Sequence, residues 1–199
     1  MKLKYYDVIR QPYHRNMALG RMGEVKVMCP DCYQLYEIRI MYNMVYDDSE
    51  IGYLDSTIKY NGECRCGYYG PLIELDVNIA KTIQILNLKG YHTKFCCEGH
   101  LSYDDDEQKE IVAGPYIYFE DSVSKDILTK YPLPNSWVVD DDYVLLIRDK
   151  YTDAASTWEY VTAQEIWDSW DKEKSLTDIY KWAKSLPHSM MIHNRRDNL

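Results

Sequence analysis

The stretch VKVMCPDCYQLYEIRI, residues 25–40, places Cys29 and Cys32 in a CPxC turn between two runs of alternating apolar residues. Alternation with a period of two predicts two strands joined by this turn. The stretch TIKYNGECRCGYYGPLIEL, residues 57–75, repeats the arrangement, with Cys64 and Cys66 in a second, glycine-bearing turn. Two cysteine pairs on two tight turns predict a β module built around a metal ion.

The four cysteines are the candidate metal ligands. Zinc binds four thiolates in a tetrahedron at about 2.3 Å, and closely spaced cysteines on tight turns supply two each without straining the backbone. Gly67 suits the second turn, because such turns often need a residue with positive φ. The alternative, two pairs of reduced thiols on surface turns, leaves their pairing unexplained. We therefore predict one structural zinc ion, with no open position for a substrate, bound by Cys29, Cys32, Cys64 and Cys66.

Between the two turns, residues 41–60 contain strand-like runs that are interrupted by DDSE and by Gly52. This pattern predicts a hairpin inserted between the cysteine pairs. With an N-terminal arm, the segment completes a first predicted domain, residues 1–75, which is a zinc-ribbon-like β module.

From Asp76 the hydrophobic period becomes helical. Residues 76–90 place Ile79, Ile83 and Leu86 on one face, with Asp76 as a candidate cap and Gly90 just past the end. The remaining segments predict a strand at 91–97, an acidic loop at 101–110, a strand at 111–121, a short helix at 122–134 and two strands at 135–150 that are joined at three aspartates. Residues 76–150 are therefore predicted to form a central mixed α+β sheet domain.

The acidic runs at 104–107 and 140–142 lack the spacing of a calcium loop, and we interpret them as solvated hairpin tips. Near the C-terminus, TAQE at 162–165 and SLTD at 175–178 resemble capping boxes that open two helices. We predict a third domain, residues 151–199, made of a helical hairpin and a tail. Trp167, Trp170 and Trp182 are expected to pack against the sheet or one another. The fold class of the chain is predicted as α+β.

The stretch YHTKFCCEGH, residues 91–100, places Cys97 and His100 on either side of a turn at Gly99. Cys97 can act as a nucleophile whose pKa is lowered by His100, with Glu98 or an acid from the 104–107 loop orienting the imidazole ring. Cys97 and His100 can instead be two ligands of a second zinc ion, or the turn can be purely structural.

The two thiols of this stretch are expected to differ in direction. On a strand at 91–97, Cys97 shares a face with Tyr91, Thr93 and Phe95, whereas Cys96 lies on the other face. We expect Cys97 and His100 to lie within about 5 Å of each other, at a site partly open to solvent. The candidate catalytic residues are therefore Cys97, Glu98 and His100.

The net charge of −9 is spread unevenly, because residues 1–40 carry seven basic and four acidic groups and residues 41–110 carry six basic and thirteen acidic groups. An acidic surface repels a phosphate backbone, so the charge disfavours general nucleic-acid binding by the whole surface, although a local basic face stays possible. Acidity also allows the opposite role, in which the chain imitates nucleic acid.

The chain shows no secretion signal at its start and no run of about 18 apolar residues that could span a bilayer. We expect a cytoplasmic protein without a membrane partner. Six cysteines in a reducing compartment are better interpreted as metal ligands or reactive thiols than as a disulfide framework.

The stretch IAKTIQILNLKGYHTKFCCEGH, followed by GPYIYFE and LPNSWVVD, resembles a set of bacteriophage and Gram-positive bacterial proteins with no assigned activity. In that set, a helix ending in LN-x-KGY leads to T-x-x-[SC]-C-x-GH and a P-Y-I-x-F strand, often behind a cysteine module. The resemblance covers roughly residues 24–148 and implies a phage or prophage origin. A shorter similarity to the SCSGR turn of the methyltransferases that make wybutosine departs at His100, which replaces the arginine.

The sequence favours an intracellular zinc-binding protein with a binding or regulatory role toward a protein or nucleic-acid partner. One alternative is a cysteine- and histidine-dependent hydrolase or transferase at the turn of residues 96–100. The other is an acidic inhibitor of a host nucleic-acid-binding protein.

Overall fold

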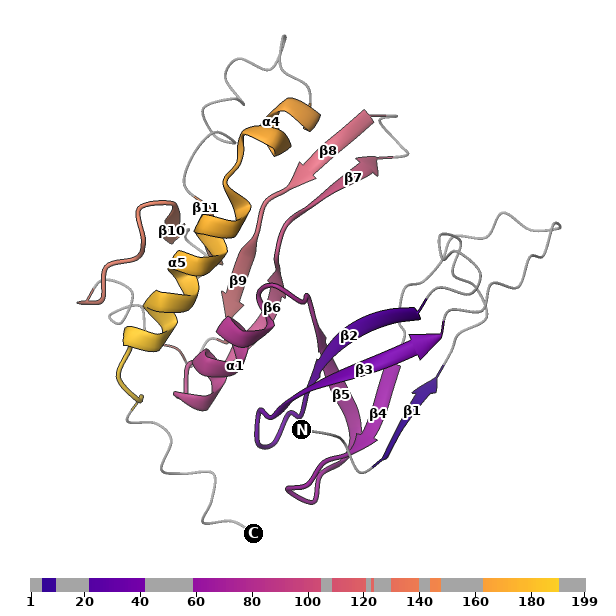
Figure 1. Cartoon of the computed structure of the whole chain (residues 1–199). Helices are drawn as coiled ribbons and strands as arrows, with labels where there is room; N and C mark the ends of the chain where they lie inside the picture. The colour runs from indigo at the N-terminus through magenta and orange to yellow at the C-terminus, as the bar shows by residue number, and fades with distance from the viewer. Residues whose placement is uncertain are drawn as a thin grey trace, which may run out of the picture. The chain divides into compact units, whose positions relative to one another are not determined.

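The computed structural model of the chain describes residues 5–9, 22–41, 59–104, 109–120, 123, 130–139, 144–147 and 163–189. The chain divides into two compact units, Met1–Val77 and Asn78–Leu199 (Figure 1). Strands and helices are both present, and the predicted α+β class is confirmed. The division into three domains with boundaries at residues 75 and 150 stays a prediction.

The described strands of the first unit form one antiparallel sheet in the order β1-β4-β5-β2-β3. They are β1 (Tyr5–Ile9), β2 (Met22–Met28), β3 (Leu35–Met41), β4 (Lys59–Glu63) and β5 (Tyr69–Leu75). The turn between β2 and β3 carries Cys29 and Cys32, and the turn between β4 and β5 carries Cys64 and Cys66. The N-terminal arm supplies β1, which pairs with β4. The predicted inserted hairpin falls mostly on residues 42–58, which lie outside the described residues.

The first unit has a small core gathered around its cysteines. Two of the thiols, Cys29 and Cys64, pack with the buried side chains of Val27, Tyr36, Ile38 and Leu72. On the other side of the hairpin, Lys26 pairs directly with Glu37 across the strands and forms an ion pair with it. Among the described residues of this unit the apolar core is small, so a metal ion held there would contribute directly to folding.

The second unit contains a four-stranded antiparallel sheet in the order β10-β11-β9-β6 and a two-stranded hairpin of β7 and β8. Its strands are β6 (Thr93–Cys97), β7 (His100–Asp104), β8 (Lys109–Ala113), β9 (Tyr116–Phe119), β10 (Trp137–Val139) and β11 (Val144–Ile147). Its described helices are α1 (Ala80–Leu88), α4 (Ala163–Ser169) and α5 (Lys172–Ser185).

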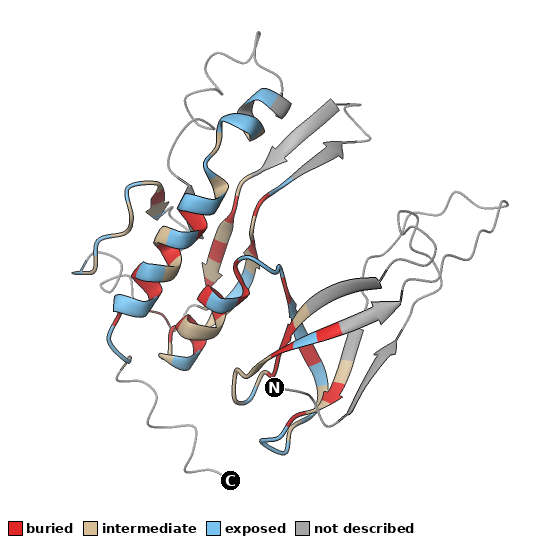
Figure 2. Cartoon of the chain, viewed as in Figure 1, coloured by how far each residue is buried: buried red, intermediate tan, exposed pale blue. Residues whose placement is uncertain are grey.

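Helices α1 and α5 lie side by side against one face of the four-stranded sheet (Figure 1). Asn87 of α1 donates to the Thr93 hydroxyl on β6 at 2.9 Å, and the Trp137 indole of β10 donates to the Ser175 carbonyl of α5 at 3.1 Å. Figure 2 shows the buried residues of both helices on their inner sides. These contacts give the unit a single helix-on-sheet core.

Helix α1 follows the predicted apolar face, because Ile79, Ile83 and Leu86 are all buried. Gly90, with φ of 87°, comes directly after its end as predicted. The predicted cap is wrong: the N-cap residue is Ile79, which makes no side-chain cap bond, and Asp76 lies outside the helix.

The acidic loop predicted at 101–110 is also wrong, because β7 and β8 pair there with Leu101 opposite Val112. Alternating residues such as these form strands even when charged residues interrupt them. Within that stretch, residues 105–108 lie outside the described residues, as do residues 124–129 of the predicted short helix and aspartates 140–142. The two strands predicted around those aspartates are confirmed as the antiparallel pair of β10 and β11.

Strand β6 contains a bulge that changes which side chains share a face. Thr93 pairs with Phe119, and the next pair is Phe95 with Tyr118, so Lys94 is the extra residue. Thr93 therefore faces α1, whereas Phe95 and Cys97 face the other side of the sheet. The predicted common face of Thr93, Phe95 and Cys97 is wrong for Thr93, because uninterrupted alternation cannot indicate a bulge.

Helix α4 begins at Ala163, within the predicted TAQE box. Helix α5 begins at Lys172, where the Asp171 carboxylate accepts from the Lys174 amide at 3.0 Å, so SLTD lies inside the helix and its predicted cap is wrong. The tryptophans pack as predicted, with Trp167 and Trp170 edge to face at 5.4 Å and Trp182 buried.

Lys89, which follows α1, caps the C-terminal end of α5. Its Nζ donates to the carbonyls of Ala183 at 3.1 Å and Lys184 at 2.6 Å, and also to the carbonyl of Leu186. A cation at the C-terminal carbonyls of a helix complements the helix dipole. The contact joins α1 to α5 across more than ninety residues of sequence.

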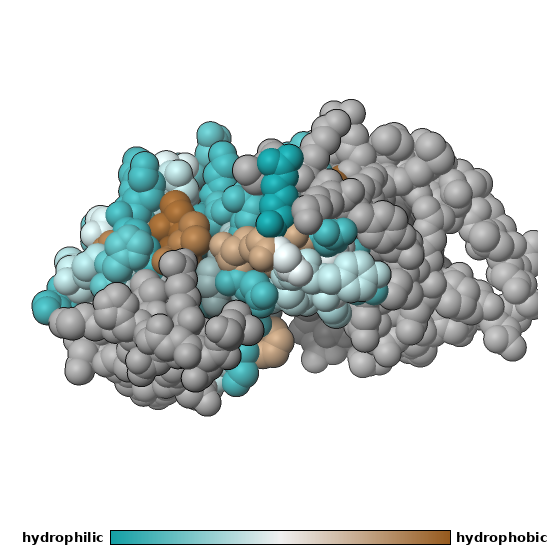
Figure 3. Space-filling model, turned by 90° about the horizontal axis from the view of Figure 1, so that it is seen from below, coloured by the Kyte–Doolittle hydropathy of each residue, from teal (hydrophilic) through white to brown (hydrophobic). Residues whose placement is uncertain are grey.

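On the face shown in Figure 3, hydrophobic residues form small patches among hydrophilic ones. Within the part of the chain that the structure describes, no helix combines the length and apolar character needed to cross a membrane.

Candidate metal centre and the turn at Cys97

The four predicted zinc ligands lie together. Their Sγ atoms are all within 4.8 Å of one another. The Sγ atoms of Cys29 and Cys66 are 3.7 Å apart, and those of Cys32 and Cys64 are 3.5 Å apart. A tetrahedral ion with metal–sulfur bonds of about 2.3 Å has sulfur–sulfur edges of about 3.8 Å. The cluster therefore has the dimensions needed to hold a metal ion.

Each cysteine pair is positioned by a tight turn with one residue in the left-handed region. In the first turn this residue is Tyr33, with φ of 56°, whose amide donates to the Cys29 carbonyl at 2.9 Å. In the second it is Gly67, with φ of 101°, whose amide donates to the Cys64 carbonyl at 3.1 Å. Glycine adopts this conformation freely, whereas tyrosine does so at a cost. The backbone of the first turn is therefore strained at Tyr33, in the conformation that brings the sulfur atoms of Cys29 and Cys32 together.

Tyr36 also contacts the cluster, although it was not among the predicted site residues. Its hydroxyl lies 2.9 Å from Cys64 Sγ, and its ring is buried on β3. Its position on the inward face of that strand, four residues after Cys32, is the signal that could have identified it. A hydroxyl that donates to a coordinating thiolate orients the ligand and partly neutralises its charge.

The thiols of the cluster have different proton affinities. Burial raises the pKa of Cys29 and raises the pKa of Cys32 to about 11. Burial also opposes ionisation of Cys64, but hydrogen bonds from the Cys66 backbone, the Tyr36 hydroxyl and the neighbouring thiols outweigh it and lower the pKa of Cys64 to about 6. A bound divalent cation would favour the thiolate form of all four ligands.

Four sulfur donors in a tetrahedron are the donor set of structural zinc sites and of some iron–sulfur sites. Cys29 and Cys64 are buried, Cys32 is partly buried and Cys66 is exposed. The donors therefore fit a closed metal shell in which the protein fills every position.

The second candidate site is the turn between β6 and β7. Cys97 Sγ lies 3.4 Å from His100 Nδ1, so the predicted proximity is confirmed. The Gly99 amide donates to the same sulfur at 3.3 Å. The imidazole is exposed, but Cys97 is only 8% exposed, so this site opens to solvent on the histidine side.

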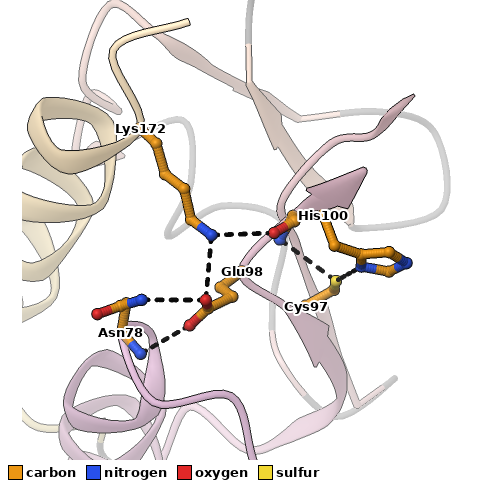
Figure 4. A network of polar contacts seen from close by, with 6 residues as sticks. Asn78, Cys97, Glu98, His100 and Lys172 are labelled. Atoms are coloured by element: carbon orange, nitrogen blue, oxygen red, sulfur yellow. Dashed lines mark hydrogen bonds and ion pairs between the residues drawn. The ribbon is translucent and has the colours of Figure 1, made fainter. Parts of the chain in front are cut away.

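The Glu98 carboxylate binds the starts of two helices. It accepts from the Asn78 amide at 2.7 Å, from Asn78 Nδ2 at 3.0 Å and from Lys172 Nζ at 3.0 Å (Figure 4). Lys172 Nζ also donates to the Gly99 carbonyl at 3.0 Å and lies 5.3 Å from the Trp167 ring. Glu98 thus joins the end of β6 to the residues that precede α1 and open α5.

In Figure 4 the Glu98 side chain points away from the His100 ring, which does not match the predicted role of Glu98 in orienting it. Partial burial raises the pKa of Glu98, but hydrogen bonds from Asn78 and Lys172 lower it below its ordinary range. The other candidate for orienting His100 was an acidic residue in the stretch 104–107. Residues 105–107 of that stretch lie outside the described residues.

A metal ion at this turn would need a third ligand beside Cys97 and His100. Among the described residues, the cysteines that form the first cluster are the group of three or more metal-binding side chains close enough to share an ion, so the described residues offer no third ligand at the turn. Cys96 pairs with Ile117 and lies on the face of the sheet opposite Cys97. The two adjacent cysteines therefore do not share a site.

No protein-family model matches the chain, and no curated protein or solved structure shows significant similarity to it.

Proposed function

We propose that the chain is a zinc-binding protein whose four-cysteine centre is structural and whose role is to bind or regulate a partner. The observation that carries this proposal is the cluster of four Sγ atoms within 4.8 Å. Zinc is favoured because an all-sulfur tetrahedron is its usual structural site. Since the protein fills all four positions, substrate has no access to the ion, and coordination serves to fold the unit.

The test is metal analysis of protein purified without chelators. We expect one zinc ion per chain, and after cobalt exchange we expect the visible absorption bands of tetrahedral Co²⁺ bound by thiolates. Cys64→Ser should lose the metal, whereas the matched variant Cys96→Ser, which changes a partly buried cysteine outside the cluster, should keep it. Less than about half an equivalent of zinc in the unaltered protein would contradict the proposal.

A phage or prophage origin and an intracellular setting are part of the same proposal. The proposed origin is supported by the resemblance of residues 24–148 to bacteriophage and Gram-positive bacterial proteins.

A second candidate function is a cysteine- and histidine-dependent hydrolase or transferase at the turn after β6. It is favoured by the 3.4 Å contact of Cys97 Sγ with His100 Nδ1 and by the Gly99 amide on the same sulfur, because both contacts can stabilise a thiolate. Alkylation rates measured against pH test it. A reactive Cys97 titrates below about 8.5 and loses that shift in His100→Ala, whereas equally slow alkylation in both proteins removes this candidate.

A further inference from the structure

The four-stranded sheet of the second unit buries one face and presents aromatic rings on the other. On β9, Ile117 and Phe119 are 0% and 1% exposed and lie on the buried face, whereas Tyr116 and Tyr118 alternate with them and are partly exposed. Since α1 and α5 pack on the buried face, these tyrosine rings point away from the helices.

The bulge in β6 adds Phe95 to the same open face. Phe95 is 61% exposed, although a phenylalanine on a strand is usually buried. It pairs directly with Tyr118 across the strands, and the two ring centroids are 6.1 Å apart with an interplanar angle of 34°. Two rings on neighbouring strands are therefore in contact on the same face of the sheet.

The residue that forms the bulge adds positive charge beside these rings. Lys94 is exposed, and its Nζ lies 5.6 Å from the centroid of the Tyr118 ring. Positive charge beside exposed aromatic rings is suited to a ligand that is both flat and anionic. We call Lys94, Phe95, Tyr116 and Tyr118 the aromatic patch.

We propose that the aromatic patch binds single-stranded nucleic acid, with bases stacked on Phe95 and Tyr118 and a phosphate near Lys94. This inference rests on the proposed binding role and specifies its partner. Some four-stranded sheets stack unpaired bases on exposed aromatic rings in this way, because every base has a flat π-face. A duplex hides those faces inside its base stack, so the patch should discriminate against it.

The charge of the chain agrees with stacking as the main source of affinity. A net charge of −9 opposes close approach of a phosphate backbone, so few phosphates can contribute. Binding through bases needs only local positive charge, which Lys94 supplies. We therefore expect a shallow dependence of affinity on salt concentration, in contrast to proteins that neutralise many phosphates.

The test is fluorescence anisotropy of labelled twelve-nucleotide oligo(dT) and oligo(U), and of a labelled duplex of the same length, with the zinc-loaded full chain. We expect the single strands to bind more tightly than the duplex. Phe95→Ala and Tyr118→Ala should each weaken binding by about tenfold. Lys94→Ala should weaken it for both single strands and lower the salt dependence further. The matched control is Leu88→Ala, which removes an exposed apolar residue from α1 and should leave binding unchanged.

Three results would overturn the inference: no binding of either single strand, equal affinity for the duplex, or affinity unchanged by Phe95→Ala and Tyr118→Ala. Sedimentation of the same samples measures the oligomeric state. If the protein is a dimer that dissociates in Phe95→Ala, the patch binds a second copy of the chain, and the inference is overturned. Zinc content is measured in parallel. Full zinc content without oligonucleotide binding rejects the nucleic-acid ligand alone, and oligonucleotide binding without zinc rejects the metal centre alone.

Discussion

Single residues far along the chain complete the ends of both helices that cover the sheet. Glu98 lies 20 residues after Asn78, yet its carboxylate accepts the amide that precedes α1, and Lys89 donates to carbonyls at the end of α5. Both side chains place charge where it complements a helix dipole. The local sequence predicts Asp76 as the cap, because a cap contributed by a distant strand leaves no pattern near the helix.

The Glu98 contacts predict a pH dependence for the stability of the second unit. The folded pKa of Glu98 is below its ordinary value of 4.5, so its contribution is fully present above about pH 4.5 and is lost as the pH falls through the lower folded pKa. We expect Glu98→Gln to be less stable by about 1 kcal/mol near pH 7, because charged hydrogen bonds are lost at a partly exposed site. The difference from the unaltered protein should shrink in acid.

Tryptophan fluorescence during urea unfolding measures this stability, because all five tryptophans belong to the second unit. Glu120→Gln, the same change in the residue that follows β9 and lies outside the described helices, is the control and should leave the free energy of unfolding nearly unchanged. A constant difference between Glu98→Gln and the unaltered protein from pH 7 to pH 3 would contradict the assignment.

Helices and strands that depend on local pattern could be predicted from the sequence. The strands on either side of each cysteine turn and the apolar face of α1 follow from the spacing of apolar residues. The start of α5 does not, because Asp171 and Ser175 are both suitable caps and tertiary packing decides between them. Ser175 is buried within the helix, where its hydroxyl accepts from the Trp170 indole at 3.3 Å.

The N-cap of α5 gives a direct test of that choice. Asp171→Ala should lower the free energy of unfolding of the second unit by about 1 kcal/mol, because the Lys174 amide loses its acceptor. Asp171→Asn keeps an acceptor and should retain most of the stability. Urea unfolding followed by tryptophan fluorescence compares the two variants, and equal stabilities would show that the side chain does not cap the helix.

The candidate metal centre was predictable to the same extent as the local elements. The four cysteines could be identified because each pair lies on its own turn, and closing a hairpin sheet brings two such turns together. The Tyr36 hydroxyl, the bulge at Lys94 and the contacts of Lys172 depend on pairing between distant strands and helices, which no single stretch of sequence encodes.

The proposed zinc ligands all belong to one compact unit of the chain, and the tryptophans all belong to the other. We expect a strong chelator to unfold the first unit and leave the second folded, because ligation free energy stabilises only the unit that holds the ion. Hydrogen exchange should then accelerate at residues 22–41 and 59–75, while the tryptophan emission spectrum stays unchanged. Simultaneous loss of the tryptophan signal would show that the two units unfold together.

The Lys89 contacts with the end of α5 have a consequence for synthesis on the ribosome. The nascent chain contains all four cysteines once Cys66 has emerged, so zinc can bind while most of the second unit is still untranslated. Lys89, by contrast, can donate to the carbonyls at the end of α5 only after residues 183–186 have been synthesised. Until then the face of the sheet that carries Ile117 and Phe119 lacks its α5 cover, and during that interval the growing chain is most open to chaperones and to aggregation.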